Sequence, residues 1–114
     1  MPFINARVSV KMTSDEELKI KEALGQAITL LPGKSEQWLM VGFQDNYHLF
    51  FQGSNNEASA FIEVKVYGKA KSDDYDALTK RITDIFHSEL DIPSSRIYVE
   101  YEETPYWGFD GANF

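Results

Sequence analysis

The sequence predicts an α+β domain in which two tandem β-α-β units form one four-stranded mixed sheet, with two helices on one face and short extra strands. The first observation is an internal repeat: FINARVSVK at Phe3–Lys11 resembles FIEVKVYGK at Phe61–Lys69, and the likeness continues downstream. The second is that apolar residues in each copy alternate at period 2 and then change to helical spacing. Since right-handed crossovers place both helices on the same side of the paired strands, the other face of the sheet stays uncovered.

Composition limits both the size of the core and the choice of partners. With 114 residues, 43% of them hydrophobic, the chain can bury one core, so we expect residues 1–114 to form a single domain. A net charge of -7 repels phosphate backbones and anionic membrane surfaces, which disfavours nucleic acid and membrane partners. The sequence has neither a signal-peptide pattern nor a membrane-spanning apolar run. We therefore expect a soluble cytoplasmic protein, with secretion by an unconventional route as an open alternative.

The first unit begins with a strand over Phe3–Lys11, in which apolar and polar side chains alternate. A helix follows, and Ser14-Asp15-Glu16-Glu17 has the pattern of a capping box with acidic residues in the first turn. We expect the helix to end at Pro32-Gly33 and the chain to return as a strand over Trp38–Gln44. The apolar stripe of this helix consists of Ile20, Leu24, Ala27, Ile28 and Leu31.

The second unit repeats this order with a strand over Ala60–Tyr67. Ser72 is the expected N-cap of the second helix, with two aspartates in the first turn, and Pro93 closes the segment. The returning strand covers Arg96–Glu103. The side chains that we expect to face the core from this helix are Leu78, Ile82, Ile85, Phe86 and Leu90.

The uncovered face of the sheet is too polar for a dry core. It would carry Asn5, Arg7, Glu63, Lys65, Tyr98, Glu100 and Glu102. One interpretation is a monomer whose outer sheet face meets water. The other is an oligomer whose sheets surround a solvated channel, with the aromatic segments Tyr47–Phe51 and Tyr106–Phe109 adding strands to neighbouring subunits. We favour the oligomer, because exposed aromatic edge segments otherwise promote aggregation.

Several patterns that would indicate other chemistry are incomplete. Gly33-Lys34-Ser35 resembles the end of a phosphate-binding loop, but Ile28 stands where that motif requires a glycine. His48 and His87 have no companions at metal-ligand spacing. The absence of cysteine excludes disulfides, thiol nucleophiles and thiolate metal sites. We therefore expect no metal and no cofactor.

Pro2 follows the initiator methionine directly, and removal of Met1 would expose its nitrogen as a secondary amine on a rigid ring. If the first strand is internal to the sheet, its start lies beside the end of another strand and near Lys34, which follows the first helix. An α-amino group has a pKa of about 7.7 to 8.0; burial and a nearby ammonium group lower that pKa. The sequence thus predicts a neutral amine that acts as general base on a carbon beside a carbonyl, while Lys34 binds a carboxylate. The expected apolar wall consists of Tyr98, Trp107, Phe109 and Phe114.

Five short motifs, in order along the whole chain, resemble the macrophage migration inhibitory factor family of the tautomerase superfamily. They are MPF at the start, PGK after the first helix, YGK at Tyr67–Lys69, RIYVEY at Arg96–Tyr101 and the terminal WGFDGANF. The resemblance implies a homotrimer of β-α-β-β-α-β subunits whose sheets form a barrel around a solvated channel. It also implies active sites at the subunit interfaces.

The resemblance assigns roles to individual residues. Pro2 matches the catalytic amine, Lys34 matches the lysine that holds the substrate carboxylate, and Tyr67 matches a position whose backbone amide points into the site. Tyr98 matches a tyrosine from the neighbouring subunit. The positions that match the apolar lining are Phe3, Trp107, Phe109 and Phe114. The implied activity is keto-enol tautomerisation of arylpyruvates such as phenylpyruvate, without cofactor or metal.

The chain departs from the family pattern at several points. Glu100 stands where better-known members carry a neutral asparagine, so a second carboxylate would lie in the pocket and repel an anionic substrate. Phe109 replaces a tryptophan, and the CxxC motif of mammalian members is absent. The alternative function is a cytokine-like signalling or binding protein that recognises a protein receptor and keeps a vestigial pocket. Dehalogenation or hydration of unsaturated acids ranks third, since none of the three arginines lies beside a matched site position.

Overall fold

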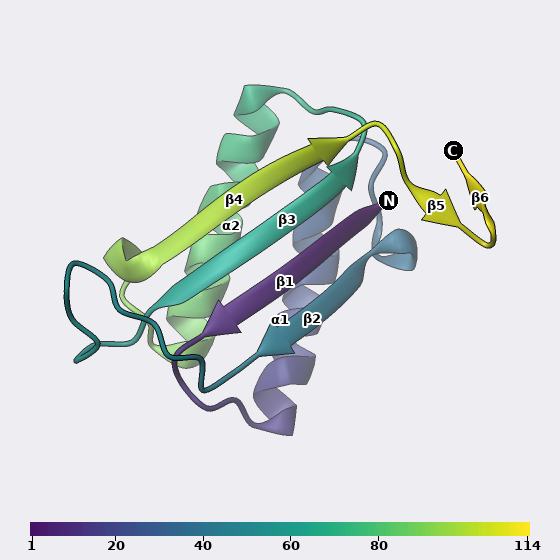
Figure 1. The fold of residues 1–114 in the computed structure, drawn as a ribbon. Coiled ribbons are helices and arrows are strands. Elements are labelled where there is room, and N and C mark those ends of the chain that lie inside the picture. Colours follow the sequence, from purple (N-terminus) through teal and green to yellow (C-terminus); the bar gives the residue numbers. More distant parts are fainter.

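A computed structural model describes residues 1–114 and has the predicted architecture (Figure 1). One sheet has the strand order β2-β1-β3-β4, in which β1 and β3 are antiparallel and the two outer pairs are parallel. Both helices cover one face of this sheet. The elements are β1 (Pro2–Val8), α1 (Ser14–Ala27), β2 (Met40–Gln44), β3 (Ala60–Tyr67), α2 (Ser72–Leu90), β4 (Ile97–Thr104) and the hairpin β5 (Gly108–Phe109) with β6 (Ala112–Asn113), together with the 3-10 turns η1 (Ile28–Leu30), η2 (Glu36–Trp38) and η3 (Ser94–Arg96).

The hydrophobic core lies between the sheet and the two helices. Buried and half-buried residues alternate along β1 and β3, so every second side chain of these central strands points toward the helices. Helix α1 contributes the predicted stripe, and α2 buries all five residues that its spacing predicts. The period-2 and helical patterns of the sequence therefore identify the core correctly.

Phe86 is the largest fully buried side chain of this core. Replacing Phe86 with alanine is expected to lower the free energy of unfolding by about 3–5 kcal/mol, because the ring leaves a cavity between α2 and the sheet. Chemical denaturation of both proteins measures the difference. Leu18→Ala is the control, since Leu18 is 56% exposed on α1, and its effect should stay within about 0.5 kcal/mol. A loss below about 1 kcal/mol for Phe86→Ala would contradict the packing described here.

The N-cap of the first helix lies one residue earlier in the sequence than predicted. Thr13, not Ser14, is the N-cap: its hydroxyl accepts a hydrogen bond from the Glu16 amide at 3.1 Å, and the Glu16 carboxylate accepts one from the Thr13 amide at 2.9 Å. The α-helix ends at Ala27 and continues as η1, so the chain leaves the helix before Pro32-Gly33. Strand β1 stops at Val8 because the Ser59 amide, next in register, donates to the Ser9 hydroxyl at 2.9 Å and so interrupts the backbone ladder between β1 and β3.

The second unit also differs at its ends. Lys71, not Ser72, is the N-cap residue of α2, and no side chain caps it. Asp91 ends the helix in the left-handed conformation with φ 56°, and Pro93 follows. Both returning strands begin later than predicted, because η2 and η3 occupy the residues where each strand was expected to start. A single 3-10 turn in each case redirects the chain into the sheet.

The two aromatic segments form little regular structure within the chain. Tyr47–Phe51 is not a strand; Phe51 makes one isolated bridge to Ser54, and Arg96 donates hydrogen bonds to the carbonyls of both residues. In the second segment only Gly108–Phe109 is a strand, and it pairs with Ala112–Asn113 in a hairpin that projects from the body (Figure 1). Neither segment pairs with the four-stranded sheet of its own chain.

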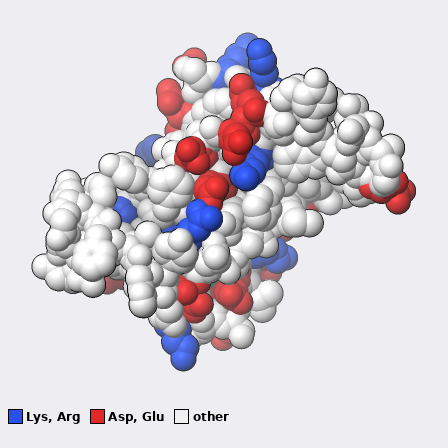
Figure 2. All heavy atoms as spheres, viewed as in Figure 1, with Lys and Arg blue, Asp and Glu red and all other residues white.

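Charged side chains gather along the open face of the sheet. Figure 2 shows acidic and basic atoms side by side across its middle, between two largely uncharged regions. Arg7 pairs with Glu63, and the Lys65 ammonium lies 3.7 Å from a Glu102 carboxylate oxygen, whereas Glu100 forms no ion pair. This polarity agrees with the predicted composition of the face. None of the helices combines the length and hydrophobicity that a membrane span requires.

Candidate functional site

The amino end of β1 lies inside the sheet, as predicted. Pro2 is buried and in register with Val66 near the end of β3. The backbone amide of Tyr67 donates a hydrogen bond of 3.0 Å to the Met1 carbonyl. Strand β1 is central in the sheet, but only β3 pairs with its first residue, since β2 begins to pair at Phe3.

Lys34 reaches the same place from the loop after η1. Gly33 takes a positive φ of 80° at this turn, and the Lys34 amide donates to the Leu31 carbonyl at 3.0 Å. The Lys34 ammonium donates a hydrogen bond of 2.9 Å to the Tyr67 carbonyl. The Tyr67 backbone thus bonds to Met1 through its amide and to Lys34 through its carbonyl. Lys34 and Tyr67, which the sequence singles out, therefore meet beside the start of β1, where Pro2 lies.

This environment favours a neutral amine at the amino terminus. The pKa of the terminal amino group, here on Met1, is lowered first by burial and then by the charge and hydrogen bonding of Lys34. Both causes disfavour the protonated form.

A cavity of about 520 Å³ opens beside Pro2. Its volume falls in the range that is usual for small-molecule sites, and most of its lining is apolar. It lies between the starts of β1 and β2, the end of β3 and the hairpin β5–β6. The lining residues are Met1, Pro2, Phe3, Gln37, Trp38, Leu39, Met40, Lys65, Trp107, Gly108 and Phe109.

Aromatic side chains form one wall of this site. The Phe109 ring packs edge-on against Trp38 at 5.3 Å and stacks with Phe114 at 6.3 Å between ring centroids. Phe114 also approaches the Tyr67 ring at 5.6 Å, and its amide donates to the Trp107 carbonyl at 3.0 Å. Of the predicted lining residues, Phe3, Trp107 and Phe109 line the cavity with Pro2, whereas Phe114 lies behind Phe109 and Tyr67 and does not line it.

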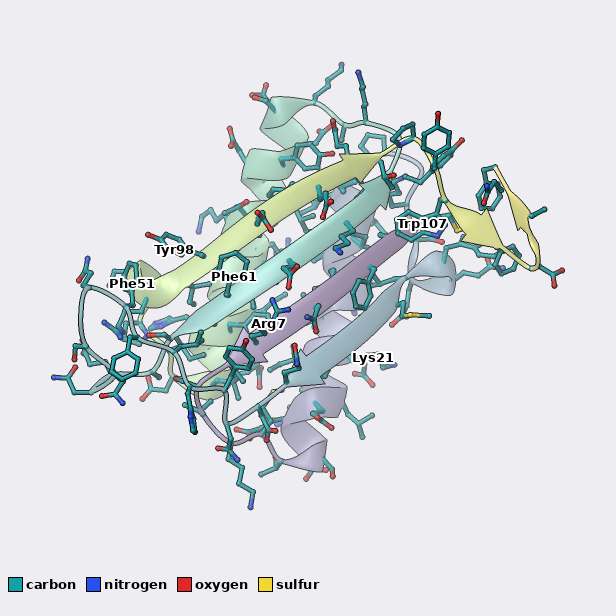
Figure 3. All side chains as sticks on the ribbon, in the orientation of Figure 1. Arg7, Lys21, Phe51, Phe61, Tyr98 and Trp107 are labelled. Carbon is teal, nitrogen blue, oxygen red and sulfur yellow. The ribbon has the colours of Figure 1, made fainter.

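Tyr98 and Glu100 are not part of this cluster within one chain. Tyr98 packs against Phe51 at 5.1 Å and Phe61 at 6.3 Å, at the start of β4. Figure 3 shows these three rings at one end of the sheet and Trp107 at the other. The Val66 partner of Pro2 is in register with Glu103, five residues along β4 from Tyr98, which corresponds to roughly 17 Å. A shared site would require a second subunit.

Four consecutive cavity residues, Gln37, Trp38, Leu39 and Met40, have no role in the site that the sequence predicts. Trp38 was expected in a strand, but it lies in η2, and that turn directs its ring toward Phe109. Lys65 was predicted on the polar face without a role in the site; it lines the cavity beside Phe3. The alternation of buried and half-buried side chains along β3 was the sequence signal that could have placed Lys65 on this face.

Glu103, whose role the sequence does not explain, anchors the loop after Tyr67. Its carboxylate accepts hydrogen bonds from the Tyr75 hydroxyl at 2.6 Å and the Ala70 amide at 3.2 Å. Burial and then the bond to Glu103 raise the pKa of Tyr75 to about 12. The bonds from Tyr75 and Ala70 lower the pKa of Glu103. The Tyr101 ring packs against Tyr75 with 4.4 Å between ring centroids and a tilt of 37°, which joins β4 to α2.

Replacing Glu103 with glutamine is expected to destabilise the fold at neutral pH, because the Tyr75 hydroxyl and the Ala70 amide lose a charged acceptor. A carboxylate with a lowered native pKa stabilises the fold above its ordinary pKa of 4.5, and this contribution disappears as the pH falls. The difference in unfolding free energy between the two proteins should therefore be largest near pH 7 and shrink below pH 4.5. Urea denaturation at pH 7 and at a pH below 4.5 measures this difference in unfolding free energy. A difference that does not change with pH would contradict the stabilising role of the Glu103 carboxylate.

The sheet with both helices on one face and the cavity beside Pro2 define an α+β domain with a candidate small-molecule site. Residues 1–114 match the family model described as macrophage migration inhibitory factor (MIF). The chain belongs to the macrophage migration inhibitory factor family.

Solved structures agree with this assignment. The crystal structure of Leishmania major MIF2 is 32% identical, with a TM-score of 0.93, over 100% of this chain and 97% of that one. A homologue from Prochlorococcus marinus is 29% identical, with a TM-score of 0.87, over 98% of both chains. A fused 4-OT, described as a wild-type symmetric trimer, shares the fold at 16% identity, with a TM-score of 0.85, over 97% of this chain and 94% of that one. Comparison with curated protein sequences finds no match.

Proposed function

We propose that this protein is a cofactor-free keto-enol tautomerase of arylpyruvates, with phenylpyruvate as the model substrate and Pro2 as general acid and base. The observation that carries the proposal is the position of Pro2 at the edge of an aromatic cavity, beside the Tyr67 backbone to which the Lys34 ammonium is bonded. Membership in the macrophage migration inhibitory factor family supports the same assignment.

Removal of Met1 is the first requirement of this mechanism. It converts the Pro2 amide nitrogen into a secondary amine and leaves the Tyr67 amide without the carbonyl acceptor that it now has. Burial and the Lys34 charge keep the pKa of an amine here below its ordinary value. A neutral amine and a free N–H donor would then face the cavity together.

The reaction needs only proton transfer. The Pro2 amine takes a proton from the carbon beside the substrate carbonyl, which forms the enolate. The protonated amine then gives this proton to the enolate oxygen, which frees the amine again and yields an enol of the same composition as the keto acid. In the reverse direction the protonated amine returns the proton to carbon. General acid-base catalysis of this kind contributes roughly 10²- to 10⁴-fold in rate.

Lys34 and the aromatic wall hold the substrate in this scheme. The Lys34 ammonium binds the substrate carboxylate next to the reacting carbon, and the aryl ring occupies the space between Trp38, Trp107 and Phe109. The low polarity of that wall strengthens the attraction between ammonium and carboxylate.

The proposal includes a homotrimer whose sheets enclose a solvated channel and whose active sites lie between subunits. Tyr98 and Glu100 would reach the cavity from a neighbouring subunit. Three features support this arrangement: the charged open face, the highly exposed Phe50 (69%) and Tyr106 (79%), and the projecting hairpin. The fused 4-OT, which shares the fold, is a symmetric trimer.

The enol-to-keto conversion of phenylpyruvate, followed by absorbance, tests the proposed activity. The assay compares protein whose intact mass confirms loss of Met1 with protein that keeps an extra residue before Pro2. The processed protein should accelerate the conversion far above the buffer rate, whereas the extended one should not. Equal rates for the two proteins would exclude Pro2 as the base.

A second candidate function is a cytokine-like binding protein whose pocket is vestigial. Glu100 favours it, because a carboxylate without an ion-pair partner in the pocket would repel an anionic substrate. Capture of a protein receptor by both the wild type and Pro2→Gly, with no turnover of phenylpyruvate by processed wild type, would support this function. Turnover that depends on Pro2 would support the enzyme.

A further inference from the structure

Within one chain the cavity beside Pro2 carries one charged side chain, and in the proposed trimer Glu100 of a neighbouring subunit would add a carboxylate that Lys65 has to outweigh. Of the 11 residues that line the cavity, Lys65 is the one with a charged type of side chain. Lys34 is not one of the lining residues; its ammonium lies near the terminal amine and donates to the Tyr67 carbonyl. Two ammonium groups therefore flank the amino end of β1, and only one of them is used by the mechanism above.

Strand register fixes the direction of the Lys65 side chain. Lys65 pairs with Phe3 of β1 and Glu102 of β4, and all three lie on the open face. Its neighbours in β3, Val64 and Val66, are buried under the helices. Because successive side chains of a strand point to opposite faces, Lys65 is held on the cavity side.

The Lys65 ammonium is weakly engaged within the chain. Its nearest carboxylate oxygen, on Glu102, lies at 3.7 Å, beyond hydrogen-bonding distance, and the two side chains are 43% and 65% exposed. An exposed ion pair at this separation contributes little to stability, and both side chains remain free to rotate. An anionic group inside the cavity would offer Lys65 a less solvated partner than Glu102 does.

We infer that Lys65 determines substrate specificity by binding a second anionic group, so that the preferred substrates are dianionic keto or enol acids. The inference rests on the proposed function of the cavity. Lys34 would hold the carboxylate beside the reacting carbon, and Lys65 would hold a carboxylate or ionised hydroxyl group at the remote end of the molecule. The proton transfer at Pro2 is unchanged, and the remote group takes no part in it.

Binding of unreactive analogues tests Lys65 independently of catalysis. Both tryptophans of the chain, Trp38 and Trp107, line the cavity, so their fluorescence reports occupancy. Titration compares phenylacetate with 4-carboxyphenylacetate for the protein without Met1. The wild type should bind the dianion at least about tenfold more tightly, as expected for one additional charged hydrogen bond. Lys65→Met should abolish this preference, so that the two ligands bind with similar affinity.

Two further variants separate local from general charge effects. Glu102→Gln should increase the preference for the dianion, because it removes the carboxylate nearest to Lys65. Lys80→Met is the matched control: it removes the same charge from an exposed position on α2 and should leave the preference intact. Equal affinities of the wild type for both ligands, or the same preference in wild type and Lys65→Met, would overturn the inference.

Kinetics keep this inference distinct from the proposed function. In one outcome, Pro2→Gly abolishes phenylpyruvate turnover, whereas Lys65→Met leaves the ratio of the kcat/KM values for 4-carboxyphenylpyruvate and phenylpyruvate unchanged. The inference about Lys65 is then wrong, and the tautomerase proposal stands. If the binding preference depends on Lys65 but neither keto acid is turned over, the anion subsite stands and the tautomerase proposal is wrong.

Discussion

Replacing Pro2 with glycine is expected to lower kcat/KM for phenylpyruvate by roughly 10²- to 10⁴-fold, the contribution of a positioned general acid or base. Glycine keeps an amino group after removal of Met1, but it lacks the ring that fixes the direction of the nitrogen lone pair. The buried ring at the start of β1 is also lost, so the amine becomes mobile and better solvated. Steady-state kinetics at neutral pH measure the loss.

The folded state of this variant must be established alongside its activity. Pro2 is at the end of β1, and the rest of that strand is held by two neighbours. The thermal unfolding midpoint and the oligomeric mass of Pro2→Gly should therefore stay close to those of the wild type. A variant that folds normally, loses Met1 and keeps the wild-type rate would show that Pro2 is not the base.

Replacing Lys34 with alanine is expected to raise KM for phenylpyruvate by roughly 10- to 100-fold, because the substrate carboxylate loses a charged hydrogen bond. The effect on kcat should be smaller, since the carboxylate is bound in both the ground state and the transition state. Lys80→Ala removes an equal charge from an exposed position on α2 and serves as the control. Its KM should equal that of the wild type.

The same variant should also change the pH dependence of the reaction. Lys34 lowers the pKa of the terminal amine by its charge and its hydrogen bond. Without Lys34 that pKa rises, so the midpoint of the kcat/KM profile should move to higher pH. A raised KM with an unmoved midpoint would leave Lys34 as a substrate ligand without influence on the amine; an unchanged KM would exclude it from substrate binding.

Much of the fold could be predicted because the core pattern is unambiguous. The alternation in β1 and β3 and the apolar stripes of α1 and α2 each admit one assignment. The N-cap of α1 was harder to predict, because two pairs fit the capping-box pattern: Thr13 with Glu16, and Ser14 with Glu17. The structure uses the first of these pairs, and local sequence offers no reason to prefer it.

The site could be predicted in part, and the limits follow from topology. Pro2 and Lys34 come together because β1 is central and its start lies beside the end of β3, which the two-unit pattern implies. Trp38 was missed because a strand assignment gives no hint of the 3-10 turn that directs its ring. Tyr98 and Glu100 lie toward the far end of β4, so their place in the site depends on contacts between chains.

The protonation state of the Pro2 nitrogen tests the central claim most directly. Protein labelled with ¹⁵N-proline and confirmed by mass to lack Met1 can be titrated by NMR, with Pro2→Gly used to assign the signal. The account predicts one proline nitrogen that titrates with a midpoint below about 7.7, the lower end for an ordinary α-amino group, and that midpoint should match the kcat/KM profile. A midpoint at or above the ordinary α-amino value would contradict the account.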